Sequence, residues 1–109
     1  MAKSPPQPRA ESRSSHAPRS VCFPLGRLLA TPRALDLLDS RGIDAVELLD
    51  RHQRGDWGEL SAEDVAANEF AIANGLRILS AYRIGEKERV WIITEADRSS
   101  TTVLLPEDY

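Results

Sequence analysis

Cysteine, histidine and long apolar runs are scarce in this chain of 109 residues. The single Cys22 excludes an internal disulfide and a cysteine-based zinc cluster. Only His52 lies outside the first twenty residues, and no second ligand other than an ordinary surface acid stands three or four residues after it, so we expect no metal site. No run of about eighteen apolar residues and no signal-peptide pattern occurs. We therefore expect a cytoplasmic protein with no membrane partner.

Glycine patterns that hold nucleotides are missing as well. The chain has no P-loop, no dinucleotide-binding signature and no nucleophile elbow. We therefore expect no cofactor.

Residues 1–20 are rich in proline and serine and have no large apolar residue after Met1. Such a segment cannot bury enough surface to offset its ordering entropy, so we predict a disordered tail followed by a single domain, 21–109. The charged residues of the tail give it a net charge of +3: Lys3, Arg9, Arg13, Arg19 and Glu11. Since the whole chain carries −3, the remainder carries −6.

The acidity is concentrated between residues 44 and 69, which hold eight acidic side chains against Arg51 and Arg54. An acidic surface opposes nucleic-acid binding, because that binding depends on neutralising phosphates. Nucleic acid remains a possible partner only through the basic tail.

Three helices are indicated by their start and stop residues. Thr31 and Pro32 predict the start of the first helix and Gly42 its end. Asp44, with Glu47 as a capping-box partner, predicts a second helix that ends near Gln53. The residues expected to face inward from these two helices are Ala34, Leu35, Leu37, Leu38, Val46, Leu48 and Leu49.

The third helix is predicted from Ser61, its N-cap, through Asn74, with Gly75 at its end. Beyond it the apolar period changes from 3.6 to 2, which predicts strands at 78–84, 90–94 and 101–105. Residues 25–30 are expected to form a short strand. We therefore predict an α+β fold, with three helices packed on a C-terminal three-stranded antiparallel meander.

The segment 52–58 is the first candidate site. His52 could act as a general acid or base that Asp56 orients. In the structural interpretation Gly55 and Gly58 shape a turn, Trp57 fills the core and Asp56 binds backbone amides. Asp56 and Trp57 are candidate binding residues in either case.

The segment 95–102 is the second candidate site. Glu95 and Asp97 beside Arg98 could act on a phosphodiester, with the arginine on the phosphate. In the structural interpretation Asp97 caps backbone amides and Arg98 pairs with a neighbouring carboxylate. Asp97, Arg98 and Ser99 are the candidate binding residues here.

Several strings resemble a family of small bacterial proteins borne by plasmids and integrative elements. They lie at 52–58, 68, 80–82, 91–99 and 101–106, and the likeness covers roughly 25–109. Some members of that family are labelled modification subunits of type I restriction enzymes. This chain departs from that label, because it has no glycine-rich methyl-donor loop and no Asn-Pro-Pro-aromatic motif. The resemblance implies a mobile-element context and supplies no catalytic residues.

Three functions follow from these patterns as hypotheses. The first is a non-catalytic accessory protein of a mobile element that binds another protein, with interference in a host defence complex as one form. The second is a small nuclease or toxin with Glu95 as base, His52 as acid, and Arg83 or Arg98 on phosphate. The third is a nucleic-acid-binding regulator that uses the tail.

Overall fold

The structure, a computed structural model, describes residues 20–109, so the tail predicted at 1–20 lies outside the described residues except for its last residue. The fold is α+β, as predicted: a four-stranded sheet, three helices and a short 3₁₀ turn. In chain order the elements are β1 (Arg27–Ala30), α1 (Pro32–Ser40), α2 (Ala45–Gln53), α3 (Ala62–Asn74), β2 (Ile78–Arg83), β3 (Arg89–Thr94), β4 (Ser100–Leu104) and η1 (Pro106–Asp108).

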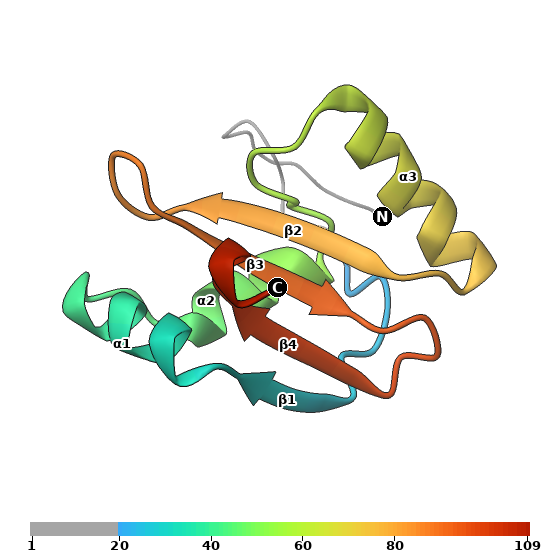
Figure 1. The fold of residues 1–109 in the computed structure, drawn as a ribbon. Coiled ribbons are helices and arrows are strands. Elements are labelled where there is room, and N and C mark those ends of the chain that lie inside the picture. Colours follow the sequence, from blue (N-terminus) through green and yellow to red (C-terminus); the bar gives the residue numbers. More distant parts are fainter. Residues whose placement is uncertain (1–19) are drawn as a thin grey trace, which may run out of the picture.

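The sheet has the order β1-β4-β3-β2 (Figure 1). The predicted meander is present, because β2 pairs with β3 and β3 with β4, both antiparallel. β1 extends the meander to four strands by pairing with β4 in parallel, and Arg27 N and Thr31 N donate to Ser99 and Val103 carbonyls. The short strand predicted at 25–30 is therefore one edge of the sheet.

The helix caps follow the predicted pattern. Thr31 accepts a hydrogen bond from Ala34 N, and Ser61 accepts one from Asp64 N. The Asp44 side chain accepts from Val46 N in place of the Glu47 N of the predicted capping box, and α3 ends at Gly75 in the left-handed conformation.

The main core lies between one face of the sheet and helices α1 and α2. Its buried members include residues of both helices and of all three strands of the meander: Ala34, Leu38, Leu48, Leu49, Tyr82, Val90, Ile92 and Val103. A second cluster of Phe23, Trp57, Ala71 and Ile78 joins α3 to the same sheet. α3 lies alongside β2, at the edge opposite β1 (Figure 1).

Two side chains predicted to face inward are exposed instead. Val46 is 65% exposed and Leu35 is 48% exposed. Val46 lies two residues before Leu48, which is about 200° around the helix and therefore on the opposite side. The inward position on the last turn of α2 is taken by His52, which is fully buried.

Candidate functional site

His52 stands at the centre of a buried polar cluster. α2 directs its imidazole into the sheet, where Nδ1 lies 2.5 Å from Ser80 Oγ on β2. Nε2 lies 2.9 Å from Thr94 Oγ1 on β3. Phe23 and Trp57 enclose the ring edge-on, at centroid distances of 5.2 and 5.8 Å. The imidazole thus has polar partners on both nitrogens and aromatic walls around it.

The cluster continues as a chain of hydroxyl groups across the sheet. Thr94 Oγ1 lies 2.7 Å from Thr101 Oγ1 on β4, and Thr101 Oγ1 donates to the Leu25 carbonyl at 2.8 Å. A carbonyl only accepts and each hydroxyl has one proton. Thr94 must therefore donate to Thr101, and His52 Nε2–H must donate to Thr94. Nδ1 is then the acceptor of a hydrogen bond from Ser80.

Burial lowers the pKa of His52 to about 3. The ring is therefore neutral near pH 7, in the single tautomer that the hydroxyl chain permits. His52, Ser80, Thr94 and Thr101 all have no exposed surface. A general acid must reach a substrate, and His52 in this position contacts only the interior of the protein.

The turn after α2 is also held by internal contacts. The Asp56 carboxylate binds Arg51 Nε at 2.7 Å, and its backbone carbonyl accepts a hydrogen bond from the Tyr82 hydroxyl at 2.6 Å. The Trp57 ring is 4% exposed, and its Nε1 donates to Glu69 at 3.2 Å. This placement corresponds to the structural interpretation of the segment 52–58, with Trp57 in the core.

Arg98 connects the 95–102 loop to α3. Its guanidinium donates to carbonyl groups near the end of that helix, Ala71 O at 2.9 Å and Leu76 O at 2.6 Å. It also donates within its own loop, to the carbonyls of Glu95 and Ala96. The expected pairing of Arg98 with a carboxylate is replaced by these carbonyl contacts.

Asp97, Ser99 and Glu95 have local partners. The Asp97 carboxylate accepts a hydrogen bond from Ser99 N at 3.0 Å, and hydrogen bonds from Ser99 lower the pKa of Asp97. Glu95 forms an ion pair with Arg77 at 3.3 Å, and Arg77 also donates to the Tyr109 hydroxyl. Asp97 thus caps a turn, as the structural interpretation predicts.

The structure does not bring the four nuclease candidates together. Arg83 pairs with Glu59 at 3.1 Å, at the end of β2 that lies beside Arg89. Glu95 follows the other end of β3, six residues from Arg89, which is about 20 Å along an extended strand. His52 is buried between them, and Arg98 is occupied by carbonyls.

The two candidate segments are linked through Phe23, which contacts a residue of each. Arg98 Cζ lies 5.7 Å from the centroid of the Phe23 ring, and that ring stacks on Trp57 at 6.2 Å. Thr101 belongs to the second candidate segment, but the contacts of the Ser80, Thr94 and Thr101 hydroxyls in the His52 cluster were not predicted from the sequence. The sequence did contain a signal for these buried hydroxyls: each belongs to a small polar residue whose neighbours on the same face of its strand are apolar.

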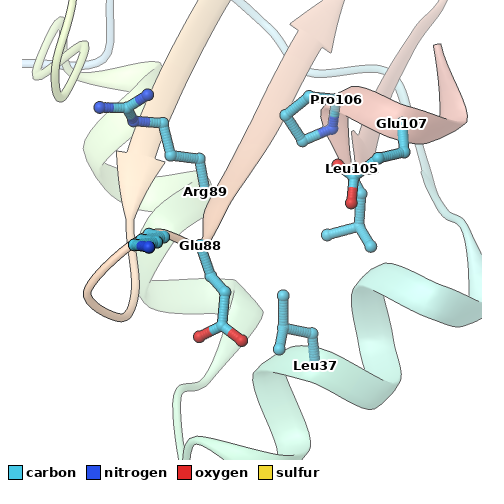
Figure 2. A pocket seen from close by; sticks show the side chains of 7 residues that line it. Leu37, Glu88, Arg89, Leu105, Pro106 and Glu107 are labelled. Carbon is cyan, nitrogen blue, oxygen red and sulfur yellow. The ribbon is translucent and has the colours of Figure 1, made fainter.

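A surface hollow of about 340 Å³ lies between α1, the β2–β3 hairpin and η1 (Figure 2). Leu37, Leu105 and Pro106 supply its apolar wall, and Leu37 and Leu105 extend into it from opposite sides. Its charged residues are of both signs: Lys87, Glu88, Arg89 and Glu107. Glu88 is engaged by Arg41 and Arg89 by Glu59, so the hollow lacks a charge pattern that would identify a ligand.

Within residues 20–109, no group of three or more His, Cys, Asp or Glu side chains gathers in a way that could hold a metal ion. None of the helices in this part of the chain has the length and apolar character needed to cross a bilayer. Comparison with family models, with curated proteins and with solved structures yields no match for this chain.

Proposed function

We propose that this protein binds another protein and does not catalyse a reaction, acting in the bacterial cytoplasm as an accessory protein of a mobile element. The polar side chains that a catalytic role would require are engaged in internal contacts. His52 is held in the core, Asp56 is bound by Arg51, and Arg98 is bound to carbonyl groups. A function must therefore use residues exposed on the outer faces of the helices and strands, and not a catalytic cleft.

The exposed Phe70 on α3 carries the proposal. Asn68 and Ala71 face the sheet, and Phe70 lies on the opposite side of the helix with 61% of its surface exposed. Three of the four residues that lie one turn from it on α3 are exposed alanines, Ala66, Ala67 and Ala73, and the fourth is Asn74. A large aromatic ring that projects from a flat apolar surface is the kind of residue that dominates binding energy when it enters a partner's pocket.

The charge around Phe70 specifies the chemistry of the partner. Glu63, Asp64 and Glu69 are exposed on the same helix, and residues 21–109 carry a net charge of −6. An apolar pocket rimmed by lysine and arginine would complement this surface. Interference with a host defence complex fits this pattern, because nucleic-acid channels are lined with such side chains.

A comparison of two exposed apolar residues tests the proposal. Tagged full-length protein, a Phe70→Ser variant and a Val46→Ser variant are used to capture proteins from a bacterial host lysate. Val46 lies on α2 and is 65% exposed, so it controls for loss of surface hydrophobicity in general. We expect one protein to bind wild type and Val46→Ser, and to bind Phe70→Ser at least about tenfold more weakly.

A partner that binds Phe70→Ser as strongly as wild type would contradict the role of α3, and the absence of any partner above background would remove the proposal.

The nuclease hypothesis is tested directly by incubating purified protein with RNA and DNA. Cleavage that Glu95→Gln abolishes would establish a nuclease in place of a binding protein.

A further inference from the structure

β1 is an open edge of the sheet. It is the outermost strand next to β4, and all four of its residues are exposed. Leu28 and Leu29 are 57% and 40% exposed, and none of the described elements lies on the outer side of β1 (Figure 1). Proteins protect such edges with charges, prolines or bulges within the strand, because an open edge pairs with other strands. The four residues of β1 include only one charge, Arg27, and no proline.

The outward backbone groups belong to Leu28 and Ala30. Arg27 N donates to Ser99 O and Thr31 N donates to Val103 O, so the odd-numbered residues of this segment direct their backbone groups toward β4. Backbone groups alternate in direction along a strand. The N–H and C=O groups of Leu28 and Ala30 therefore point away from the sheet and can form hydrogen bonds with a further strand.

We propose that β1 pairs with β1 of a second copy of this chain, in antiparallel orientation about a two-fold axis through Leu29. In this register Leu28 of each copy lies opposite Ala30 of the other, which uses all the outward groups in four backbone hydrogen bonds. The two Leu29 side chains meet across the axis. Two four-stranded sheets become one sheet of eight strands.

The neighbouring registers are less favourable. Moving the axis to Ala30 places Leu28 opposite Pro32, which has no N–H to donate. Moving it to Leu28 places the two Arg27 side chains at diagonal positions, about 7–8 Å apart, where like charges repel. The register centred on Leu29 avoids both problems.

Charge complementarity identifies the second copy as the occupant. In the Leu29-centred register Arg27 lies opposite Thr31 of the other copy, on the same face of the sheet. The Thr31 hydroxyl donates to Asp108 Oδ2 at 2.7 Å, so a carboxylate stands beside that position. Arg27 forms no ion pair within 4 Å among the described residues. Arg33 of its own chain lies 3.5 Å from the other oxygen of Asp108, Oδ1, so the pairing adds Arg27 of one copy to the Arg33–Asp108 ion pair of the other, on each side of the axis.

This inference is independent of the proposed binding through α3. α3 lies at the β2 edge, which the strand order places at the far side of the sheet from β1. Pairing through β1 would leave both copies of Phe70 exposed and would make the assembly bivalent.

The experiment measures the mass of the full chain in solution by sedimentation equilibrium. We expect a species of twice the 12.1 kDa chain mass, with the Leu28 and Ala30 amides protected from hydrogen exchange. Ala30→Pro removes an outward N–H without removing a bond to β4. Leu29→Asp places two carboxylates opposite one another. Each change should raise the dimer dissociation constant at least about tenfold.

Leu35→Asp is the matched control, because Leu35 is 48% exposed but lies on α1. It should remain dimeric, and circular dichroism should show that all three variants fold. A wild-type protein that is monomeric at every concentration would overturn the inference, as would a dimer that survives both β1 substitutions. A monomer with protected Leu28 and Ala30 amides would mean that the same chain covers the edge, and would overturn it as well.

Discussion

The imidazole of His52 exchanges water for two hydroxyl groups when the chain folds, one from Ser80 and one from Thr94. In a neutral ring one nitrogen donates and the other accepts, so both nitrogens are hydrogen-bonded by these hydroxyls. A charged ring would have two N–H donors, and neither Ser80 nor Thr94 offers it a negative charge. A buried polar group is tolerated when each of its atoms is bonded, and a buried charge is tolerated only when it is paired. His52 therefore stays unprotonated in the folded protein near neutral pH.

The stability of the protein should fall as the pH is lowered from 6.5. The folded state binds a proton on His52 only below about pH 3, whereas the unfolded chain binds one below about 6.5. Protons therefore favour the unfolded chain in this range, and the free energy of unfolding decreases by up to about 1.4 kcal/mol per pH unit. Urea denaturation at several pH values between 6.5 and 4.5 measures this slope.

His52→Gln serves as the control for this measurement. The lowered pKa values of Glu59, Asp97 and Asp108 have the same sense but act at lower pH: their stabilisation is present above about pH 4.5 and is lost below it. The variant should therefore show little slope between pH 6.5 and 4.5. Equal slopes in the variant and the wild type would contradict the assignment to His52.

A second prediction compares two adjacent threonines on β4. Thr101→Val removes the donor of the Leu25 carbonyl and the acceptor of the Thr94 hydroxyl proton, which should cost about 1–3 kcal/mol. Thr102 points to the other face and is half-buried, so Thr102→Val should change the free energy of unfolding by less than about 0.5 kcal/mol. Chemical denaturation of both variants gives the comparison, and equal losses would argue against the hydroxyl chain.

Among the connections between elements, the backbone around Gly58 covers the outer edge of β2. Trp57 O accepts from Ala81 N, and Glu59 N donates to Ala81 O. Asn68 of α3 binds both backbone groups of Leu79 on the same edge. The β2 edge is thus covered by hydrogen-bonded segments, while the β1 edge is open.

Gly58→Ala should destabilise the protein much more than Gly42→Ala. Both glycines have a positive φ, 78° and 67°, so an added side chain costs about 1–2 kcal/mol at either position. At Gly58 a Cβ would also collide with the Ala81 carbonyl oxygen, while at Gly42 it would meet nothing within 4 Å. Thermal unfolding of the two variants should show the difference, and similar melting temperatures would mean that the 57–59 segment can move away from β2.

Local signals predicted the helices and the meander, because caps and turns act within a few residues. The Thr31, Asp44 and Ser61 caps and the Gly75 stop are physical contacts in the structure. The parallel pairing of β1 with β4 was not predictable in the same way, since it joins residues more than seventy positions apart and leaves no local pattern.

The candidate sites were found as polar segments, but their partners were not. The residues that bind His52 come from two different strands, and Arg98 binds carbonyls that no sequence pattern marks. The exposure of Val46 and Leu35 was not predicted. A helix of nine residues has too few turns for its apolar residues to show which face is buried and which is exposed.

At the scale of the whole molecule, the two core clusters share one sheet. Trp57 belongs to the cluster at α3, whereas Val90 and Val103 belong to the cluster at α1 and α2. The side chains of Ser80, Thr94 and Thr101, which His52 connects, lie on the same face of the sheet as both clusters. The domain should therefore unfold as one cooperative unit.

Fluorescence and circular dichroism test this expectation. The chain has two tryptophans, and Trp91 lies half-buried against Tyr109 on the other face. In a Trp91→Phe variant Trp57 reports only on the α3 cluster, while circular dichroism reports on all helices and strands. The two urea transitions should have the same midpoint. Separate midpoints would show that the α3 cluster unfolds on its own.

The hydroxyl chain also bears on how the sheet avoids mispairing. A slip of one strand by two residues keeps every side chain on its own face, so the apolar pattern alone does not distinguish it from the native register. The native register places Thr94 opposite both Ile78 and Thr101. A slipped strand would leave hydroxyl groups unsatisfied in an apolar layer, at a cost of about 1–3 kcal/mol each. The hydrogen bonds of His52 and its hydroxyl partners therefore favour the native register over a slip of two residues.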